Sequence, residues 1–114
     1  MEVRSRASLE PFTTKDGSTI REYLHTGSQS LAEASLEPGQ STERHHHRRS
    51  EEIYLIVAGG GAMEIDGDVR QVAPGDAILI PAGSWHTLIA GEAGARLLCC
   101  CVPPYSHDDT YLEP

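Results

Sequence analysis

The chain has 114 residues, and its 9 lysines and arginines against 17 aspartates and glutamates give a formal net charge of −8. A chain of this length can bury one hydrophobic core, so we predict a single domain over residues 1–114. The acidic balance argues against nucleic acid as a partner, because binding to a phosphate backbone needs a basic face.

The N-terminal segment is polar and contains no apolar run that could serve as a secretion signal. No later window has the length and hydropathy of a membrane span. We therefore expect a cytoplasmic protein with no membrane partner. Residues 1–19 are predicted to form an arm or an edge strand, and residues 106–114 a tail.

Turn signals recur at short intervals along the rest of the chain, and only strand-length segments fit between them. Residues 52–57, 62–65, 77–80 and 96–102 are rich in apolar and β-branched residues, and 20–24 and 31–36 have strand-like patterns. The one candidate helix, residues 31–37, is too short to stand alone and is predicted to be a strand. Many short strands without helical crossovers predict an all-β fold, either a sandwich or a barrel.

The densest group of potential metal ligands surrounds the triplet His45-His46-His47. Taken alone, such a triplet could equally be a solvated surface patch. Because alternate side chains of a strand share a face, His45 and His47 can point into a barrel together while His46 points away. The next predicted strand places Glu52 and Tyr54 on one face, so that Glu52 can meet both inward histidines.

The spacing of glycines, histidines and one glutamate resembles the two sequence motifs of the cupin superfamily. The first motif is matched by Gly39, His45, His47, Glu52 and Gly59, and most of the second by Gly75, Pro81, Gly83 and His86. Residues 39–90 thus carry both motifs, and agreement at nine ordered positions is far more specific than a single short pattern.

This resemblance implies a small single-domain cupin, an RmlC-like jelly-roll barrel or double-stranded β-helix. It also implies that His45, His47, Glu52 and His86 bind one divalent transition metal inside the barrel. Three imidazoles and one carboxylate suit Fe, Mn, Ni, Co, Cu or Zn, and affinity alone does not choose among these ions.

Within the family, this ligand set is associated with dioxygenases acting on small molecules and with isomerases and lyases. The metal acts in each case as a Lewis acid and template. We therefore expect a metal-dependent enzyme with a small-molecule substrate. The alternative is a small-molecule-binding or sensing cupin without catalysis.

Further residues are expected near the site. Tyr54, predicted to point inward, is the candidate proton donor, and Arg49 is the candidate contact for an anionic substrate. Leu88 and Ala90 share a face with His86 and are expected on the cavity wall. Ala90 stands where the second motif usually closes with asparagine, so the contact made by that amide in relatives is not expected here.

Two ambiguities concern neighbouring residues. Glu51 is the rival of Glu52 as the carboxylate ligand, and the six-residue spacing to Gly59 favours Glu52. Cys99, Cys100 and Cys101 are adjacent, which does not suit a disulfide framework. We predict that they are reduced, buried core residues, with a reactive thiol as the alternative.

The small open barrel also leaves sheet edges and an apolar outer face to be covered, so a homodimer is expected.

Overall fold

Strands account for most of the computed structural model, which describes all 114 residues. The helical segments are two single 3₁₀ turns, η1 (Arg6–Ser8) and η2 (His107–Asp109), and no helix is long and apolar enough to cross a membrane. The predicted all-β fold is therefore confirmed. The strands are β1 (Phe12–Thr13), β2 (Thr19–His25), β3 (Ser30–Leu36), β4 (His45–His47), β5 (Glu51–Ile65), β6 (Asp68–Val72), β7 (Ala77–Ile80), β8 (His86–Val102) and β9 (Thr110–Leu112).

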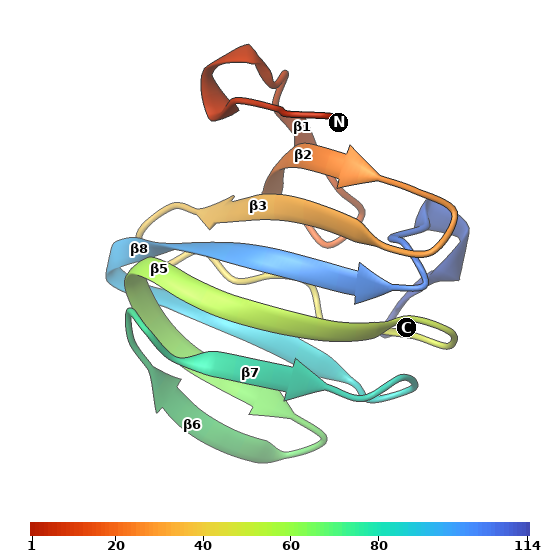
Figure 1. Cartoon of the computed structure of the whole chain (residues 1–114). Helices are drawn as coiled ribbons and strands as arrows, with labels where there is room; N and C mark the ends of the chain where they lie inside the picture. Colours follow the sequence, from red (N-terminus) through yellow and green to blue (C-terminus); the bar gives the residue numbers. More distant parts are fainter.

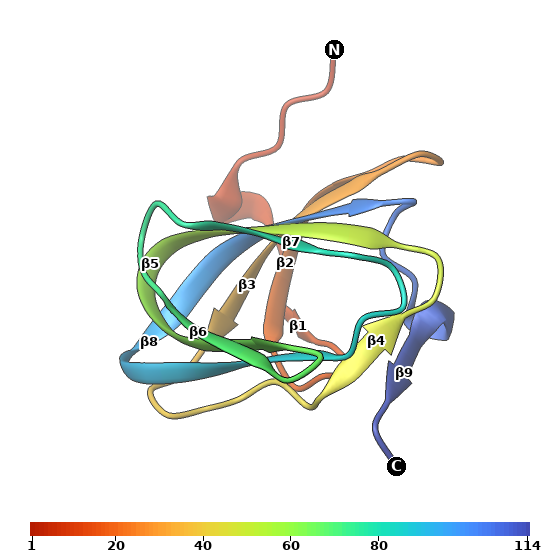
Figure 2. The ribbon, with the colours of Figure 1, turned by 90° about the horizontal axis from the view of Figure 1, so that it is seen from below.

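Antiparallel pairing joins these strands in the order β1-β2-β3-β8-β4-β9, and β5 pairs with β6, β7 and β8. The two long strands β5 and β8 run together along most of their lengths and bend so that each takes part in both walls of the barrel (Figure 1). Viewed along a perpendicular direction, the strands curl around a common interior (Figure 2).

Glycines permit the bend in β5. A β-carbon at Gly59 would lie 2.1 Å from the carbonyl oxygen of Gly94, and one at Gly61 would lie 2.0 Å from that of Ile89. Gly59 also has a φ of +68°, which side chains rarely adopt. The pairing of β5 with β8 shifts register at these positions, as expected where a strand turns a barrel corner.

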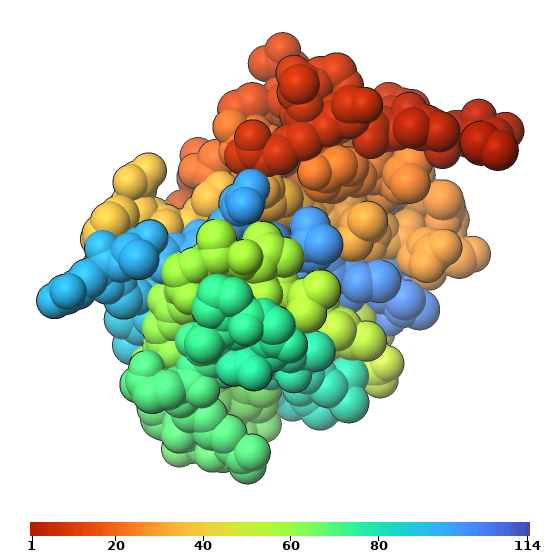
Figure 3. Space-filling model, turned by 60° about the vertical axis from the view of Figure 1, so that its left-hand side comes forward, coloured from red at the N-terminus to blue at the C-terminus, as the bar shows by residue number.

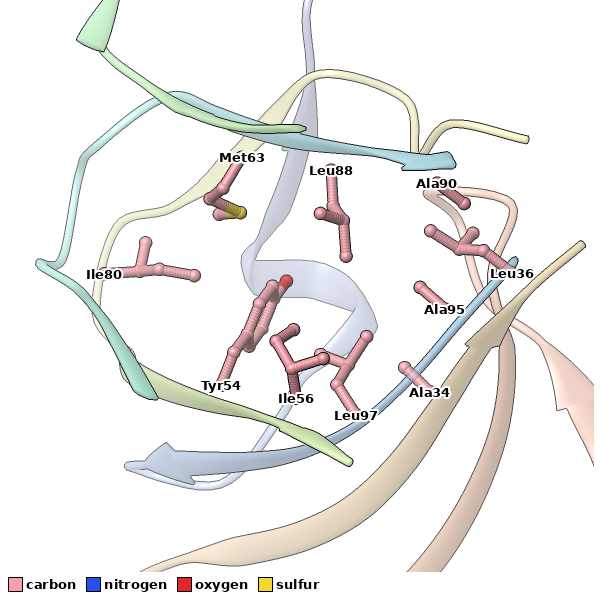
Figure 4. Close-up of a cluster of buried hydrophobic side chains, with 10 residues drawn as sticks. All are labelled: Ala34, Leu36, Tyr54, Ile56, Met63, Ile80, Leu88, Ala90, Ala95 and Leu97. Carbon is pink, nitrogen blue, oxygen red and sulfur yellow. The ribbon is translucent and has the colours of Figure 1, made fainter. Parts of the chain in front are cut away.

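Strict alternation of buried and exposed residues positions the interior. Along the first half of β5, Glu52, Tyr54 and Ile56 are buried while their neighbours are exposed. Apolar side chains from both walls meet in the interior, as Figure 4 shows. The members of this core are Ala34, Leu36, Tyr54, Ile56, Met63, Ile80, Leu88, Ala90, Ala95 and Leu97.

Both chain ends contribute to the sheet. In the N-terminal segment, which lies across one end of the molecule (red in Figure 3), β1 forms the sheet edge beside β2. Residues 106–114, predicted as a tail, instead contain η2 and β9, and β9 pairs with the histidine strand β4. A three-residue strand after a polar turn is too short to be recognised from its pattern, but here it pairs with β4 on the side opposite β8.

Candidate metal centre

Four side chains from three strands meet in the barrel interior. His45 and His47 come from β4, Glu52 from β5 and His86 from β8, and each residue is at most 5% exposed. Their ligand atoms all lie within 4.8 Å of one another. Pairing of β4 with β8 places His45 directly opposite His86, so the sheet register itself assembles the group.

Backbone carbonyl oxygens orient the three imidazoles. The Nδ1 atoms of His45, His47 and His86 lie 2.6, 3.2 and 2.9 Å from the carbonyl oxygens of Glu43, Asp109 and Ser84. A carbonyl oxygen only accepts hydrogen bonds, so each Nδ1 is assigned the proton and each Nε2 offers its lone pair to the centre of the group. This arrangement is typical of metal-binding histidines.

The Glu52 carboxylate faces these lone pairs. Its Oε1 lies 2.8 Å from His47 Nε2 and 3.4 Å from His86 Nε2. Neither Oε1 nor His86 Nε2 has a hydrogen-bond partner, although both atoms are buried. Two ligands that share one ion at about 2.1 Å lie about 3.0–3.4 Å apart, so the donor set fits a divalent transition metal.

Two cysteine thiols hold the other oxygen of the same carboxylate. Cys99 Sγ and Cys101 Sγ donate to Glu52 Oε2 over 2.8 and 3.3 Å. A hydrogen bond with Cys101 and burial raise the pKa of Cys99 well above its ordinary value, so this thiol keeps its proton and remains a donor. Cys99 and Cys101 therefore line the site beside the carboxylate, a role beyond the core packing predicted from sequence, while Cys100 lies on the opposite face of the strand.

The charges of the group are set by burial and by mutual contacts. Burial, assisted by repulsion from His86, lowers the pKa of His45 to about 4. Burial alone would raise the pKa of Glu52, but His47 and His86 outweigh it and hold this pKa well below its ordinary value. Burial would likewise lower the pKa of His47, and the contact with Glu52 outweighs it and raises this pKa. At neutral pH the group thus contains a carboxylate and a neutral His45, the forms that bind metal ions.

A cavity adjoins the group and is lined by twenty residues, among them His45, His47 and Glu52. Half of these twenty residues are hydrophobic. The volume of this cavity is about 50 Å³, which is enough for a few water molecules. A cavity of this size can accommodate a small ligand.

The structure brings Tyr54 and Leu88 to this cavity. The Tyr54 hydroxyl points into the barrel interior (Figure 4), and its ring lies 6.3 Å from that of His86. Burial raises the pKa of Tyr54 well above its ordinary value, so its hydroxyl is protonated at neutral pH. Ala90 is buried in the core and is not among the cavity-lining residues.

Arg49 lies outside the cavity, and its side chain is 72% exposed. The backbone N–H groups of Arg48, Arg49 and Ser50 all donate to the Asp109 carboxylate, which fixes a turn at this point. Strand alternation therefore does not apply to Arg49, and the expected contact with an anionic substrate has no geometric support.

The neighbours of the ligand residues lie on other faces. His46 packs outside the barrel, with its ring centroid 4.2 Å from that of Trp85 and 5.1 Å from that of Tyr111. Glu51 is exposed at the start of β5. In both the histidine triplet and the glutamate pair, neighbouring residues thus lie on opposite faces of their strand.

Sequence reasoning missed Asp16. This residue lines the cavity from the loop between β1 and β2, and its Oδ2 lies 3.6 Å from His45 Nε2. In the sequence, Asp16-Gly17 reads as an ordinary turn, and no motif spacing links it to the histidines.

Comparisons with known proteins agree with this architecture. KdgF from a Halomonas species is 21% identical and superposes with a TM-score of 0.84, covering 93% of this chain and 96% of its own. An RmlC-like cupin from Shewanella frigidimarina is 16% identical with a TM-score of 0.80, covering 90% of this chain and 91% of its own. The nucleoside dehydratase Pac13 is 17% identical with a TM-score of 0.85, covering 99% and 91%.

Sequence relationships identify the family. An uncharacterised protein of Methanocaldococcus jannaschii is 45% identical over 110 residues, which cover 91% of this chain and 88% of that protein. The cupin domain family model matches residues 32–101, a segment that contains all four residues of the buried histidine–glutamate group. This chain belongs to the cupin family.

Proposed function

We propose that this cupin binds one divalent transition metal through His45, His47, Glu52 and His86 and acts as an enzyme on a small organic substrate in the adjoining cavity. The observation that carries this proposal is the pair of buried, unpartnered atoms Glu52 Oε1 and His86 Nε2, which face one another across 3.4 Å. Burying polar atoms without partners is costly, and a bound cation would satisfy both.

When bound, the metal would supply Lewis acidity and a template for the oxygen or nitrogen atoms of a substrate. Side chains of the protein would orient the ligands, exclude water and hold a proton near the substrate. The thiols of Cys99 and Cys101 hold Oε2 of Glu52, so that Oε1 faces the imidazoles. Apolar side chains such as Leu88 and Leu97 restrict water in the cavity, and Tyr54 holds a proton at its hydroxyl beside it.

The proposed reaction is either a dioxygenase-type oxidation or an isomerase- or lyase-type rearrangement. Catalysis, as opposed to binding alone, is supported by the position of Tyr54, whose hydroxyl points into the barrel interior at the cavity wall and can donate a hydrogen bond to a bound molecule as charge develops on it. Both reaction types use a metal ion that leaves coordination positions open for a substrate, which tetrahedral zinc with four protein ligands would not.

The test begins with metal content. Protein loaded separately with Fe(II), Mn(II), Ni(II), Co(II) or Zn(II) should retain up to one ion per chain in elemental analysis, and absence of uptake for every ion would refute the proposal. Loaded protein is then mixed with small diketones, catechols and thiols, and both oxygen consumption and product formation without oxygen are followed. Metal uptake with ligand-induced shifts in melting temperature but no turnover would instead support a binding or sensing protein.

A further inference from the structure

Asp16 is held rigidly beside the candidate metal centre by its loop. The backbone N–H of Glu43 donates to the carbonyl oxygen of Asp16 over 2.7 Å. On the other side of the loop, Lys15 Nζ donates to the carbonyl oxygen of Thr110 over 2.8 Å. The loop is therefore tied to the residues just before β4 and to β9, the two elements that border His45 and His47.

The two carboxylate oxygens of Asp16 have different surroundings. Oδ1 accepts hydrogen bonds from Thr14 Oγ1, from the backbone N–H of Ser18 and from Ser18 Oγ, at 2.8, 2.9 and 2.6 Å. Oδ2 receives no hydrogen bond and lies 3.6 Å from His45 Nε2, which carries no proton when Nδ1 donates to Glu43. Oδ2 is thus a free acceptor at the cavity wall.

Geometry places this oxygen beyond the coordination sphere of the proposed metal. Two ligands of one ion lie at most about 4.2 Å apart when each bond is about 2.1 Å. Asp16 does not belong to the group of four residues whose ligand atoms lie within 4.8 Å of one another. Its free oxygen therefore lies outside the proposed set of metal ligands, at the wall of the adjoining cavity.

Apart from the histidines that would bind the metal, the charged side chains of the cavity wall are all acidic. Its lining includes three carboxylates, Asp16, Glu22 and Glu52, and no lysine or arginine. Apart from the metal ion, an anionic ligand would meet only like charges in a partly desolvated space, where they are poorly screened. Neutral and cationic ligands do not encounter this repulsion.

We infer that Asp16 determines substrate class: its Oδ2 accepts a hydrogen bond from an O–H or N–H group of a small uncharged or cationic molecule, and carboxylates and phosphates are disfavoured. This inference rests on the proposed function, because the molecule is expected to bind the metal through an atom near that donor group. The role is one of recognition and requires no chemical step at Asp16.

The substitution Asp16→Asn tests this role with little structural change. Asparagine Oδ1 can keep all three hydrogen bonds from Thr14 and Ser18, while the free acceptor becomes an N–H donor without charge. The matched control is Asp68→Asn, the same chemical change at a side chain that is 62% exposed. The probes are glycolamide and glycolate, which have nearly the same shape but differ in charge.

Binding of both probes is followed by visible absorption of the Co(II)-loaded protein. The wild type and Asp68→Asn should prefer glycolamide over glycolate. In Asp16→Asn the affinity ratio of glycolate to glycolamide should rise about tenfold or more, because a like charge is removed and a donor is gained. A ratio unchanged within experimental error would overturn the inference, as would failure of both probes to alter the wild-type spectrum.

Cobalt uptake, measured first by elemental analysis, separates this test from that of the proposed function. If wild-type protein takes up no metal, the proposed function fails. If the wild type binds cobalt but Asp16→Asn does not, Asp16 is a metal ligand and the recognition role is wrong. Equal cobalt uptake in all three proteins is the expected result.

Discussion

At the scale of single residues, the histidine triplet shows how strand geometry separates chemically identical neighbours. His45 and His47 are buried beside Glu52, whereas His46 contacts Trp85 on the outside. Removing an inward imidazole deletes one of four donors, and removing the outward one deletes only an aromatic contact. The same division between two strand faces separates Glu52 from Glu51.

Loss of a residue that only supports a metal ligand typically lowers metal affinity roughly 10- to 100-fold. We therefore expect a larger loss of affinity in His45→Ala, His47→Ala and His86→Ala, because each removes a ligand itself. His46→Ala, the matched control, should bind metal like the wild type. Metal content of all variants is measured after one common loading protocol. If His46→Ala emptied the site while His45→Ala kept it filled, the assignment of the strand faces would be inverted.

A second prediction concerns the thiols on Glu52. Replacing both Cys99 and Cys101 by alanine removes the donors to Oε2, so metal affinity should fall roughly 10- to 100-fold. Replacing both by serine should restore most of the affinity, because a hydroxyl also donates. Competition with a chelator measures the affinities, and Cys100→Ala serves as the control. Equal affinity of the double alanine variant and the wild type would show that the thiols do not position Glu52.

At the scale of elements, the sequence pattern predicted which segments are strands but not how far they extend. Residues 52–57 and 62–65 were predicted as separate strands, because three consecutive glycines between them read as a turn. The structure joins them in β5, since glycine at these positions bends the strand around a barrel corner without ending it.

The motif spacing did predict all four members of the buried group. Asp16 could not be predicted, because its place at the cavity depends on long-range docking of a loop.

An ion-pair network links the start of β4 to β5 and to the C-terminal residues. Arg44 Nε lies 2.7 Å from Glu64 Oε1, and the Arg44 guanidinium also contacts Glu113. The hydrogen bond from Arg44 holds the pKa of Glu64 below its ordinary value of 4.5. The folded protein therefore favours the charged form of Glu64, and this stabilisation is present at neutral pH and is lost as pH falls through the lowered pKa.

Glu64→Gln should accordingly reduce the free energy of unfolding at neutral pH by about 1 kcal/mol or less, as is usual for partly exposed pairs. The difference from the wild type should disappear as pH falls below 4.5 and Glu64 becomes protonated. Urea unfolding of metal-free protein at several pH values measures this difference in the free energy of unfolding. Glu51→Gln, at an exposed position, is the control. A difference that grew on acidification would contradict the assigned sign.

At the scale of the whole molecule, the outer face of β5 and β7 is uncovered (yellow-green and green in Figure 3), and large apolar side chains are exposed on it. Ile53 and Leu79 are register partners and are 47% and 56% exposed, and Leu55 and Val57 continue the face along β5. Contiguous exposed apolar side chains of this kind are typical of protein–protein contacts.

We expect this face to form a homodimer, with light scattering reporting twice the mass of one chain at micromolar concentration. Ile53→Glu should shift the equilibrium towards the monomer, because it buries a charge in the contact. Val69→Glu, at an exposed position on β6, is the matched control and should leave the mass unchanged. A monomeric wild type would contradict the prediction.

The pairing of β4 with β9 also determines when the site can form during protein synthesis. His47 Nδ1 contacts the carbonyl oxygen of Asp109, a residue translated 62 positions later. Until that segment has left the ribosome, β4 can pair only with β8, and the His47 ring lacks the carbonyl that orients it. Assembly of the histidine–glutamate group is thus a late, non-local event in folding. A nascent chain in which all the histidines have already been synthesised does not yet contain a preformed metal site.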